Sequence, residues 1–548
     1  MSSSSINGGN DEPRVTSVFL DERISTAELD GVSQNAAAAA DDDADRNNNG
    51  RCGLLAYCSF RGHRESQGIN ITGIARGAIS MSNVYLANSM IHLACKQGGG
   101  FEEGKEFCTD YSVEVYGMKP GALISNIAII ASVLAAFLMP IFGAIIDFTP
   151  HRRMVGVGTA LVLFAISAIQ IGTVETTWFA MAILQAIIFM IYQVQKMAIF
   201  AYFPEVNSDV GPKRMNEYTS TWSLTQFSSQ ATFNICILAC VSGFALTTIQ
   251  TSMLSQTGTT IFCMIFLTWG WKLIPNRPRK HKLPKGQSIL LAGFKQNWRT
   301  CKSIWKNYKT GLRWFLVATA FAEAAAAGVT TTAVIFLNGN LQLSPLQIGI
   351  FFQVSLMTVI VGTKLGAVVT KYTNPVTSLK LSQLGLCLVI AIGVHLVQYA
   401  KSKSRTYIWG AAIGIFLGWF YPTENLVFAQ CLPKGQETEL AGFFMYCTQI
   451  LGWFPPLIFT VMVQNDINMK WALTAVSFTF LISIFFLCLM SSWPEVLEEA
   501  RTVDVDIFSD DEENDDIKER DEEEPTSVDN IAIGSKKDDN NNAHDNGH

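Results

Sequence analysis

The chain has 548 residues, of which 49% are hydrophobic and only 16% are charged. This balance is too apolar for an ordinary soluble enzyme of that length, and it predicts a polytopic membrane protein. The formal net charge of -6 hides an uneven distribution, because acidic residues are concentrated in the two tails and most bases lie in short loops between apolar runs.

The first 50 residues are rich in Ser, Asn, Asp and Ala, and they lack the basic start, apolar middle and cleavage site of a signal peptide. Such a composition cannot bury enough apolar surface to fold. We therefore expect a disordered cytoplasmic tail over residues 1–70, with membrane insertion driven by the first true span.

The first span is expected over residues 73–94, where Arg76, Asn83 and Asn88 interrupt an apolar run. A polar helix of this kind is typical of one that faces a water-filled cavity. The second span, residues 121–146, is free of charged side chains. At about 1.5 Å per residue it is long enough to cross a hydrocarbon core of roughly 30 Å.

Ten further apolar runs complete a prediction of twelve spans in two groups of six, which lie near residues 154–173, 177–203, 219–247, 255–274, 312–337, 346–370, 377–399, 407–430, 440–463 and 470–492. A basic segment separates the two groups. The expected domains are a bundle at 71–275, a basic cytoplasmic loop at 276–311, a second bundle at 312–493 and an acidic, disordered cytoplasmic tail at 494–548.

The cysteines are scattered singly, without a C-x-x-C pair or the ligand spacing of a zinc site. We therefore expect no metal and no cofactor. Cys95 and Cys108 flank a predicted non-cytoplasmic loop, and whether they form a disulfide in an oxidising lumen is left open.

The end of the second span and the loop after it contain Gly143, Asp147, Arg152 and Arg153 in the order G-A-I-I-D-F-T-P-H-R-R. This order resembles the G-x-x-x-D-x-x-G-R-R signature of major facilitator superfamily transporters. The resemblance implies an all-α membrane protein of twelve helices in two six-helix bundles. A small residue there allows close helix approach, and the charges can form a conformational latch at the cytoplasmic helix ends. The alternative is a plain stop-transfer pair of arginines.

Lys and Arg near span ends favour the cytoplasmic side of a membrane. The basic segment at 276–311 and the bases of the other inner loops therefore predict that both termini are cytoplasmic. The outer loop with Lys401, Lys403 and Arg405 disagrees with this orientation, but it carries fewer bases than the central segment.

Charges inside spans are costly and therefore mark candidate functional residues. Four of them fall on the first, fourth, seventh and tenth predicted spans, which the major facilitator resemblance places around a central cavity. With two amides of the first span they form the predicted substrate-binding set, Arg76, Asn83, Asn88, Lys196, Glu323 and Glu424.

Each of these residues has a structural alternative. Glu323, near the middle of its span, can bind a substrate amine or a coupling proton, or it can pair with a base. Lys196 and Glu424 can pair as a gate between opposite halves. Arg76 can extend to the headgroups, and Asn88, like Asn83, can form an interhelical hydrogen bond.

Three stretches resemble the autophagy-linked vacuolar amino-acid effluxer family, namely Ala87-Asn88-Ser89, Tyr202-Phe-Pro-Glu205, and Phe428-Ala-Gln-Cys-Leu-Pro433 followed by Glu437-Thr-Glu-Leu-Ala-Gly-Phe-Phe and Leu451-Gly-Trp-Phe-Pro455. The resemblance implies export of neutral amino acids from a vacuole or lysosome-like compartment by alternating access. Where family members have Arg-Ser after a glycine pair, this chain has Glu424-Asn425, which reverses the local charge.

Two other functions stay open, a carrier for a sugar, folate-like or organic anion substrate, and a transporter-shaped receptor or scaffold. We expect no enzyme, because G-x-S-x-G, Walker A and H-E-x-x-H motifs are absent. The expected partners are a small solute, protons as one candidate coupling ion and the lipid bilayer, but no nucleic acid. Ser509, followed by four acids, resembles an acidophilic-kinase site and suggests a cytoplasmic partner or kinase for the tail.

Overall fold

The computed structural model describes residues 63–101, 108, 110–210, 212–278, 288–397, 403–432 and 437–502. These residues are almost entirely helical, and no strand occurs among them. Most of the two tails expected to be disordered lies outside the described residues. The tail predictions were too long at their inner ends, because residues 64–70 and 494–502 belong to helices.

The N-terminal half consists of α3 (Arg64–Gln97), α4 (Pro120–Phe148), α5 (Arg152–Gln170), α6 (Trp178–Phe200), α7 (Phe203–Val210), α8 (Pro212–Phe244), α9 (Thr248–Phe262), a π-helical turn (Cys263–Leu267) and α10 (Thr268–Leu273). The C-terminal half consists of α12 (Leu312–Gly339), α13 (Pro345–Tyr372), α14 (Pro375–Leu396), α15 (Lys403–Cys431), α16 (Glu437–Ile450), α17 (Phe454–Gln464), α18 (Met469–Ser477) and α19 (Thr479–Cys488). Between and after the halves lie α11 (Ile289–Asn307) and α20 (Trp493–Thr502).

Every predicted span coincides with a helix or with consecutive helices. The eleventh is broken between α16 and α17, because Pro455 and Pro456 follow the turn and cannot donate to a helix ladder. Nine of the described helical segments are long and apolar enough to cross a membrane. The exact number of twelve spans stays a prediction, since α3, the α9–α10 run and α15 are more polar than the others.

The most polar of the predicted spans, α3, lies in the interior. Arg76, Asn83 and Asn88 of α3 are all buried, as are Asn70 and Thr72 on the same helix. In a bilayer, polar side chains are tolerated where they face protein or a water-filled cavity. Burial of its polar residues therefore explains why α3 is a weak apolar signal in the sequence.

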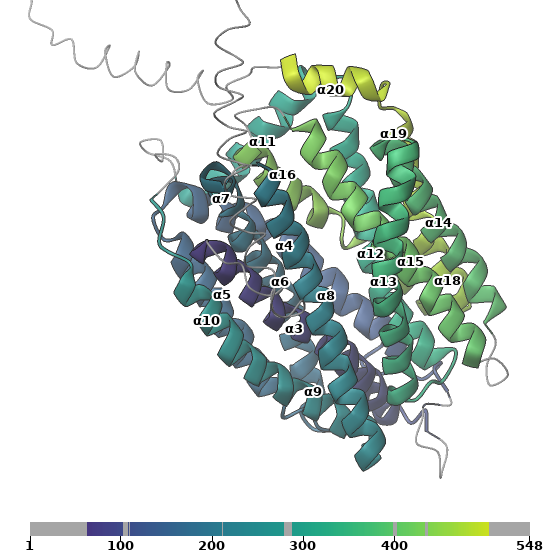
Figure 1. Ribbon diagram of the computed structural model, residues 1–548. Coiled ribbons are helices and arrows are strands. Elements are labelled where there is room, and N and C mark those ends of the chain that lie inside the picture. The colour runs from purple at the N-terminus through teal and green to yellow at the C-terminus, as the bar shows by residue number, and fades with distance from the viewer. Residues whose placement is uncertain are drawn as a thin grey trace, which may run out of the picture. The chain divides into compact units, whose positions relative to one another are not determined.

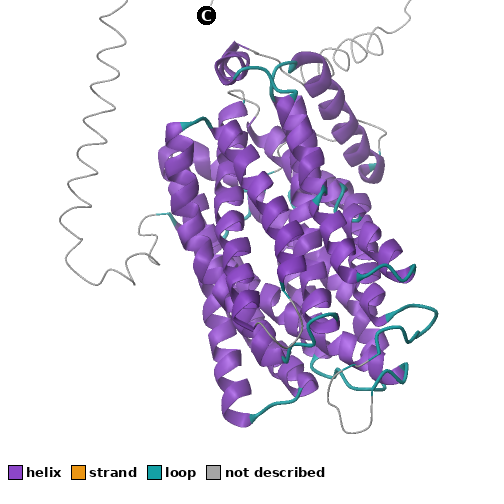
Figure 2. Cartoon of the chain, turned by 90° about the vertical axis from the view of Figure 1, so that its right-hand side faces the viewer, coloured by secondary structure: helices purple, strands orange, loops and turns teal. Residues whose placement is uncertain are grey.

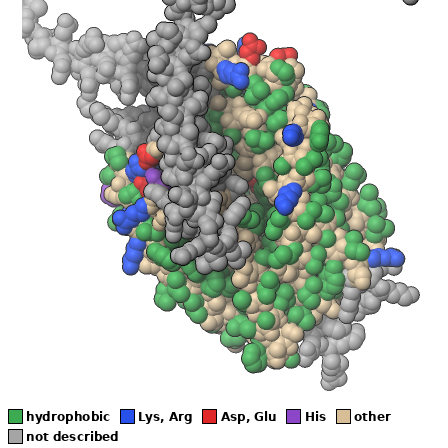
Figure 3. Space-filling view, in the orientation of Figure 1, with side chains coloured by type: hydrophobic (Ala, Val, Ile, Leu, Met, Phe, Trp, Pro, Cys, Tyr) green, Lys and Arg blue, Asp and Glu red, His purple; other side chains and the backbone are tan. Residues whose placement is uncertain are grey.

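Large hydrophobic side chains are exposed on the outer helices, including Ile130, Leu161, Ile183, Ile360 and Leu388. Hydrophobic side chains as a class cover much of the visible face of the molecule (Figure 3). Exposure of apolar side chains on this scale is unfavourable in water and favourable against lipid. The chain is a multi-pass membrane protein.

The two halves lie side by side, with helices of the N-terminal half in purple to teal and those of the C-terminal half in green to yellow (Figure 1). They meet where α4 packs against α16 and α17, and where α8 packs against α13. Figure 2 shows the long helices running roughly parallel, with loops at both ends. We call the end with α7, α11 and α20 the basic end, and the opposite end, with Cys95 and Cys108, the disulfide end.

Glycines hold α13 and α15 in close contact. Gly410, Gly414 and Gly418 recur every four residues on α15, and a Cβ on Gly414 or Gly418 would lie 2.1 or 2.0 Å from a backbone oxygen of α13. Two hydroxyl groups of α13 form hydrogen bonds to α15 across this close contact. Ser355 Oγ donates to the carbonyl of Gly410 at 2.8 Å, and Thr363 Oγ1 donates to that of Gly418 at 3.0 Å. Small residues allow such packing between helices in a membrane.

We expect Gly414→Ala to lower the stability of the protein by about 1–3 kcal/mol, because the added methyl group would overlap the carbonyl of Ser355. The measurement is the apparent melting temperature of the purified protein in detergent. Gly158→Ala is the control, since its Cβ would have no neighbour within 4 Å. Equal melting temperatures for the two variants would contradict this account of the packing.

Candidate functional site

Arg76 is deeply enclosed in the N-terminal half, with only 1% of its surface exposed. Its Nη1 donates to the carbonyl oxygen of Tyr192 at 2.9 Å and contacts Oε1 of Gln195 at 3.5 Å. Its guanidinium lies 3.7 Å from the centre of the Tyr192 ring. Arg76 is therefore held in the bundle interior by α6, which does not agree with a side chain that extends to the headgroups.

The Arg76 site extends into a polar group on α6 and α8. The hydroxyl of Tyr192 donates to the carbonyl of Arg76 at 3.5 Å and accepts from Nε2 of Gln226 at 3.4 Å. Nε of Arg76 is buried and has no hydrogen-bond partner among the described residues. The guanidinium thus keeps an unused donor in the interior.

Two carboxyl groups of the C-terminal half lie together opposite this region. Glu424 of α15 is 1% exposed, and its carboxyl lies close to that of Glu323 on α12 and to the hydroxyl of Thr319. Two carboxylates buried side by side repel each other, and a proton on one of them removes that repulsion. Because Oε1 of Glu424 has no hydrogen-bond partner among the described residues, this pair can hold a proton in the interior.

Lys196 of α6 connects the two sets of charges. Its ammonium group lies within electrostatic range of Glu323, Glu424 and Arg76, and 5.6 Å from the centre of the Phe200 ring. The structure contains no direct ion pair between Lys196 and Glu424 in the part of the chain it describes. The predicted gate between them is therefore not formed here and stays a prediction.

These residues form one group, the central cluster, which consists of Arg76, Tyr192, Lys196, Glu323, Tyr421 and Glu424. Cations come from α3 and α6, and carboxyl groups from α12 and α15. Tyr421 interacts with both carboxyl groups and with Tyr192 across the halves. Sequence reasoning missed both tyrosines, although Tyr192 precedes Lys196 by one helical turn.

Polar bonds join the two halves at the disulfide end. Asn338 of α12 donates through Nδ2 to Oδ1 of Asn88 on α3, and its own Oδ1 accepts from the Tyr111 hydroxyl at 2.6 Å. Asn234 of α8 donates to the carbonyl of Gly349 on α13 at 2.9 Å. Asn88 thus makes an interhelical bond, one of the two roles expected for it.

A second set of bonds at this end joins α4 to α17. Lys119 Nζ forms an ion pair with Asp466 at 2.6 Å and donates to the carbonyl of Val463 at 3.2 Å. The hydroxyl groups of Ser125 and Thr460 are 2.6 Å apart. These bonds and those of Asn88 and Asn234 close the disulfide end between the halves. Asn83 is also buried, and its Oδ1 has no hydrogen-bond partner among the described residues.

Cys95 and Cys108 form a disulfide at the same end, with their Cα atoms 6.0 Å apart. It ties the end of α3 to the following loop. Gln342, which follows α12, donates to the carbonyl of Cys108 at 3.3 Å. The sequence left open whether these two cysteines pair, and the structure contains the disulfide. Through Gln342 it also supports the contact between the halves.

A family model described as vacuole effluxer Atg22 like matches residues 71–496 of this chain. The chain belongs to this Atg22-like family. The match covers both halves and most of neither tail, and it confirms the family that the sequence motifs indicated. No curated protein matches the chain.

Solved structures of two transporters have similar folds. A variant of the nucleoside transporter NupG is 13% identical, with a TM-score of 0.54, and the match covers 78% of this chain and 99% of NupG. The xylose transporter XylE from E. coli, in an inward-open conformation, is 13% identical, with a TM-score of 0.52, and the match covers 79% of this chain and 98% of XylE. These likenesses show the major facilitator fold, and with the family they make this Atg22-like protein a membrane transporter.

The predicted latch lies at the basic end and takes a form that the sequence did not predict. Arg152 is 1% exposed, and its Nη1 pairs with Oε1 of Glu205 at 2.8 Å. Glu205 belongs to the Tyr202-Phe-Pro-Glu205 motif of the Atg22-like family, and Arg277 approaches its other oxygen at 3.6 Å. The family motif therefore supplies the acid for the signature arginine, within the N-terminal half.

The other latch residues have smaller roles. Arg153 donates through Nε to the carbonyl of Trp271 at 3.2 Å. Asp147 is the penultimate residue of α4. No close helix contact occurs at Gly143, because an added Cβ would meet only Met197 Sδ, at 4.0 Å. Gly156 instead packs directly against the Trp271 ring.

We expect Arg152→Met to lower stability by about 2 kcal/mol, since it removes charge-assisted hydrogen bonds from a buried site. Arg153→Met is the matched control and should have a smaller effect. Apparent melting temperature in detergent compares the two variants. An equal or larger loss for Arg153→Met would show that the pair with Glu205 does not stabilise this end.

Proposed function

We propose that this Atg22-like transporter exports neutral amino acids from a vacuole-like compartment to the cytosol by alternating access. In this proposal both termini and the basic end face the cytosol, and the disulfide end faces the lumen. The basic residues of the helix ends support this orientation, and a luminal location suits the Cys95–Cys108 disulfide.

The observation that carries the proposal is the arrangement of charges in the central cluster. A neutral amino acid is a zwitterion, so its site needs a cation for the carboxylate and an acid for the ammonium group. Arg76 and Lys196 supply cations from the N-terminal half, and Glu323 with Glu424 supplies the acid from the C-terminal half. A substrate between them would draw the halves together.

The two neighbouring carboxyl groups support protons as the coupling ion. A proton on Glu323 or Glu424 removes the repulsion that two ionised carboxylates so close together would have. Release of this proton would leave a carboxylate free to bind the substrate ammonium group or Lys196. Proton binding and substrate binding are thereby linked through the same two residues.

Alternating access then requires that the polar bonds of the disulfide end break. In the conformation described, bonds of Asn88, Lys119, Ser125 and Asn234 close that end, so exchange of substrate would take place at the basic end. Opening to the lumen would replace these bonds by water as the halves rock about the central cluster.

The test is uptake into proteoliposomes of a radiolabelled panel of neutral amino acids, sugars, folate and dicarboxylates, with and without a pH gradient. We expect saturable amino-acid uptake that the gradient stimulates. Glu323→Gln should lower the stimulated rate about tenfold or more, because a charge-assisted hydrogen bond contributes about 1.5–3 kcal/mol.

Glu498→Gln is the matched control, because Glu498 is exposed on α20, far along the chain from the central cluster, and it should transport like the wild type. Uptake of sugars or organic anions with no amino-acid flux would contradict the proposed substrate. Amino-acid flux that Glu323→Gln leaves equally sensitive to the gradient would contradict the proposed proton site.

A further inference from the structure

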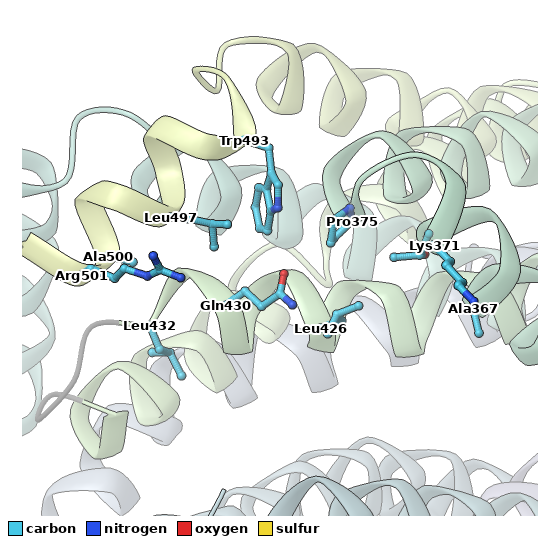
Figure 4. A pocket seen from close by; sticks show the side chains of 11 residues that line it. Ala367, Lys371, Pro375, Leu426, Gln430, Leu432, Trp493, Leu497, Ala500 and Arg501 are labelled. Carbon is cyan, nitrogen blue, oxygen red and sulfur yellow. The ribbon is translucent and has the colours of Figure 1, made fainter. Parts of the chain in front are cut away.

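A cavity of about 670 Å³ opens at the basic end of the C-terminal half, away from the central cluster. It lies between the ends of α13 and α15, the start of α14 and one face of α20 (Figure 4). From α20, Trp493 and Leu497 project toward α15, whose Gln430 projects toward them (Figure 4). The proposed transport mechanism makes no use of this cavity.

The charged residues that line the cavity are both basic, Lys371 at the end of α13 and Arg501 at the end of α20. Neither forms an ion pair with another residue that the structure describes. None of the three acids of α20 lines the cavity, and two of them are engaged elsewhere. Glu499 accepts from the backbone N–H groups of Lys309 and Thr310 at 2.7 and 3.1 Å, and Glu495 accepts from Ser492 Oγ at 2.7 Å. The cavity is therefore electropositive.

The rest of the lining fits a ligand with both a charged and an apolar part. Pro375, the first residue of α14, places the positive end of that helix at the cavity wall. Gln430 offers an amide, whereas Leu426, Leu432 and Leu497 form apolar walls. An anion with an attached hydrocarbon part matches this combination.

The position of the cavity identifies the source of such a ligand. The last turn of α13 exposes Val368 and Tyr372, which are 53% and 83% exposed, on its outer surface. That turn is the level at which a spanning helix leaves the hydrocarbon core and meets the headgroups. A cavity at this level, lined by bases and leucines, lies next to the phosphates of the bilayer.

We propose that this cavity binds the phosphorylated headgroup of an anionic phospholipid, with Arg501 and Lys371 contacting different phosphate groups of the lipid from opposite sides of the cavity (Figure 4), and the leucines contacting the upper part of the acyl chains. The site ties α20 to the ends of α13 and α15 through the lipid. It is independent of the transported substrate.

The experiment titrates full-length protein in detergent with a short-chain phosphatidylinositol monophosphate and follows bound lipid by native mass spectrometry. We expect one saturable site. The double variant Lys371→Gln/Arg501→Gln should bind about 30-fold more weakly, since each base near a membrane surface contributes about 1 kcal/mol, or roughly fivefold, to the attraction of anionic lipid. Lys364→Gln, an exposed base on α13 outside the cavity, should bind like the wild type.

Three results would overturn the proposal. One is an equal loss of binding in Lys364→Gln, which would indicate nonspecific attraction. Another is equally tight binding of a water-soluble inositol phosphate, which would assign the site to a free phosphate ester. The third is lipid binding that appears only after deletion of Asp510 to His548, which would make the acidic tail the occupant. Unchanged melting temperatures of the variants serve as the folding control.

Discussion

The arrangement of this transporter depends on one electrostatic constraint. Arg76 and Lys196 on one side, and Glu323 and Glu424 on the other, lie in an interior where an uncompensated charge is costly. Because cations and acids come from opposite halves, neither half compensates its own charge. Contact between the halves is therefore favourable, because each half then compensates the charges of the other. Separation of the halves is costly unless a proton or a substrate compensates the charges instead.

Each half is suited to move as a unit. Gly410, Gly414 and Gly418 bring α15 against α13, and hydroxyl groups of α13 bond to the carbonyls that this approach exposes. In the N-terminal half, Arg152 joins α5 to α7 through Glu205. By contrast, the described polar bonds between the halves are hydrogen bonds and one ion pair at the disulfide end, which water can replace. This difference in strength favours rocking of two rigid halves over rearrangement within either of them.

The sequence predicted the elements well because apolar runs of spanning length are a strong signal. It also identified the four charges of the central cluster, since a charge inside an apolar run has few explanations. It did not identify their partners. Tyr192 and Tyr421 look like ordinary span residues. Asn338 and Asn234 form hydrogen bonds with residues more than a hundred positions away, which no local pattern indicates. Similarly, the acid for Arg152 came from Glu205, beyond two helices, rather than from the signature loop.

The sequence prediction also missed two amphipathic helices, α11 and α20. The sequence prediction treated 276–311 as a loop and 494–548 as a disordered tail, yet α11 and α20 occupy parts of both. Short helices of mixed polarity are stabilised by packing on the bundle rather than by their own composition. For example, Gly293 of α11 packs against the carbonyl of Pro140 on α4, a contact that no local pattern indicates.

The central claim is that the disulfide end must open between the halves during transport, and a cross-link tests it most directly. Ser125→Cys/Thr460→Cys places two thiols where two hydroxyl groups now lie 2.6 Å apart, on α4 and α17. We expect oxidation to join them, as verified by mass spectrometry, to stop uptake, and reduction to restore it, with the wild type and each single variant treated in parallel. Undiminished uptake by the fully cross-linked protein would contradict alternating access through this end.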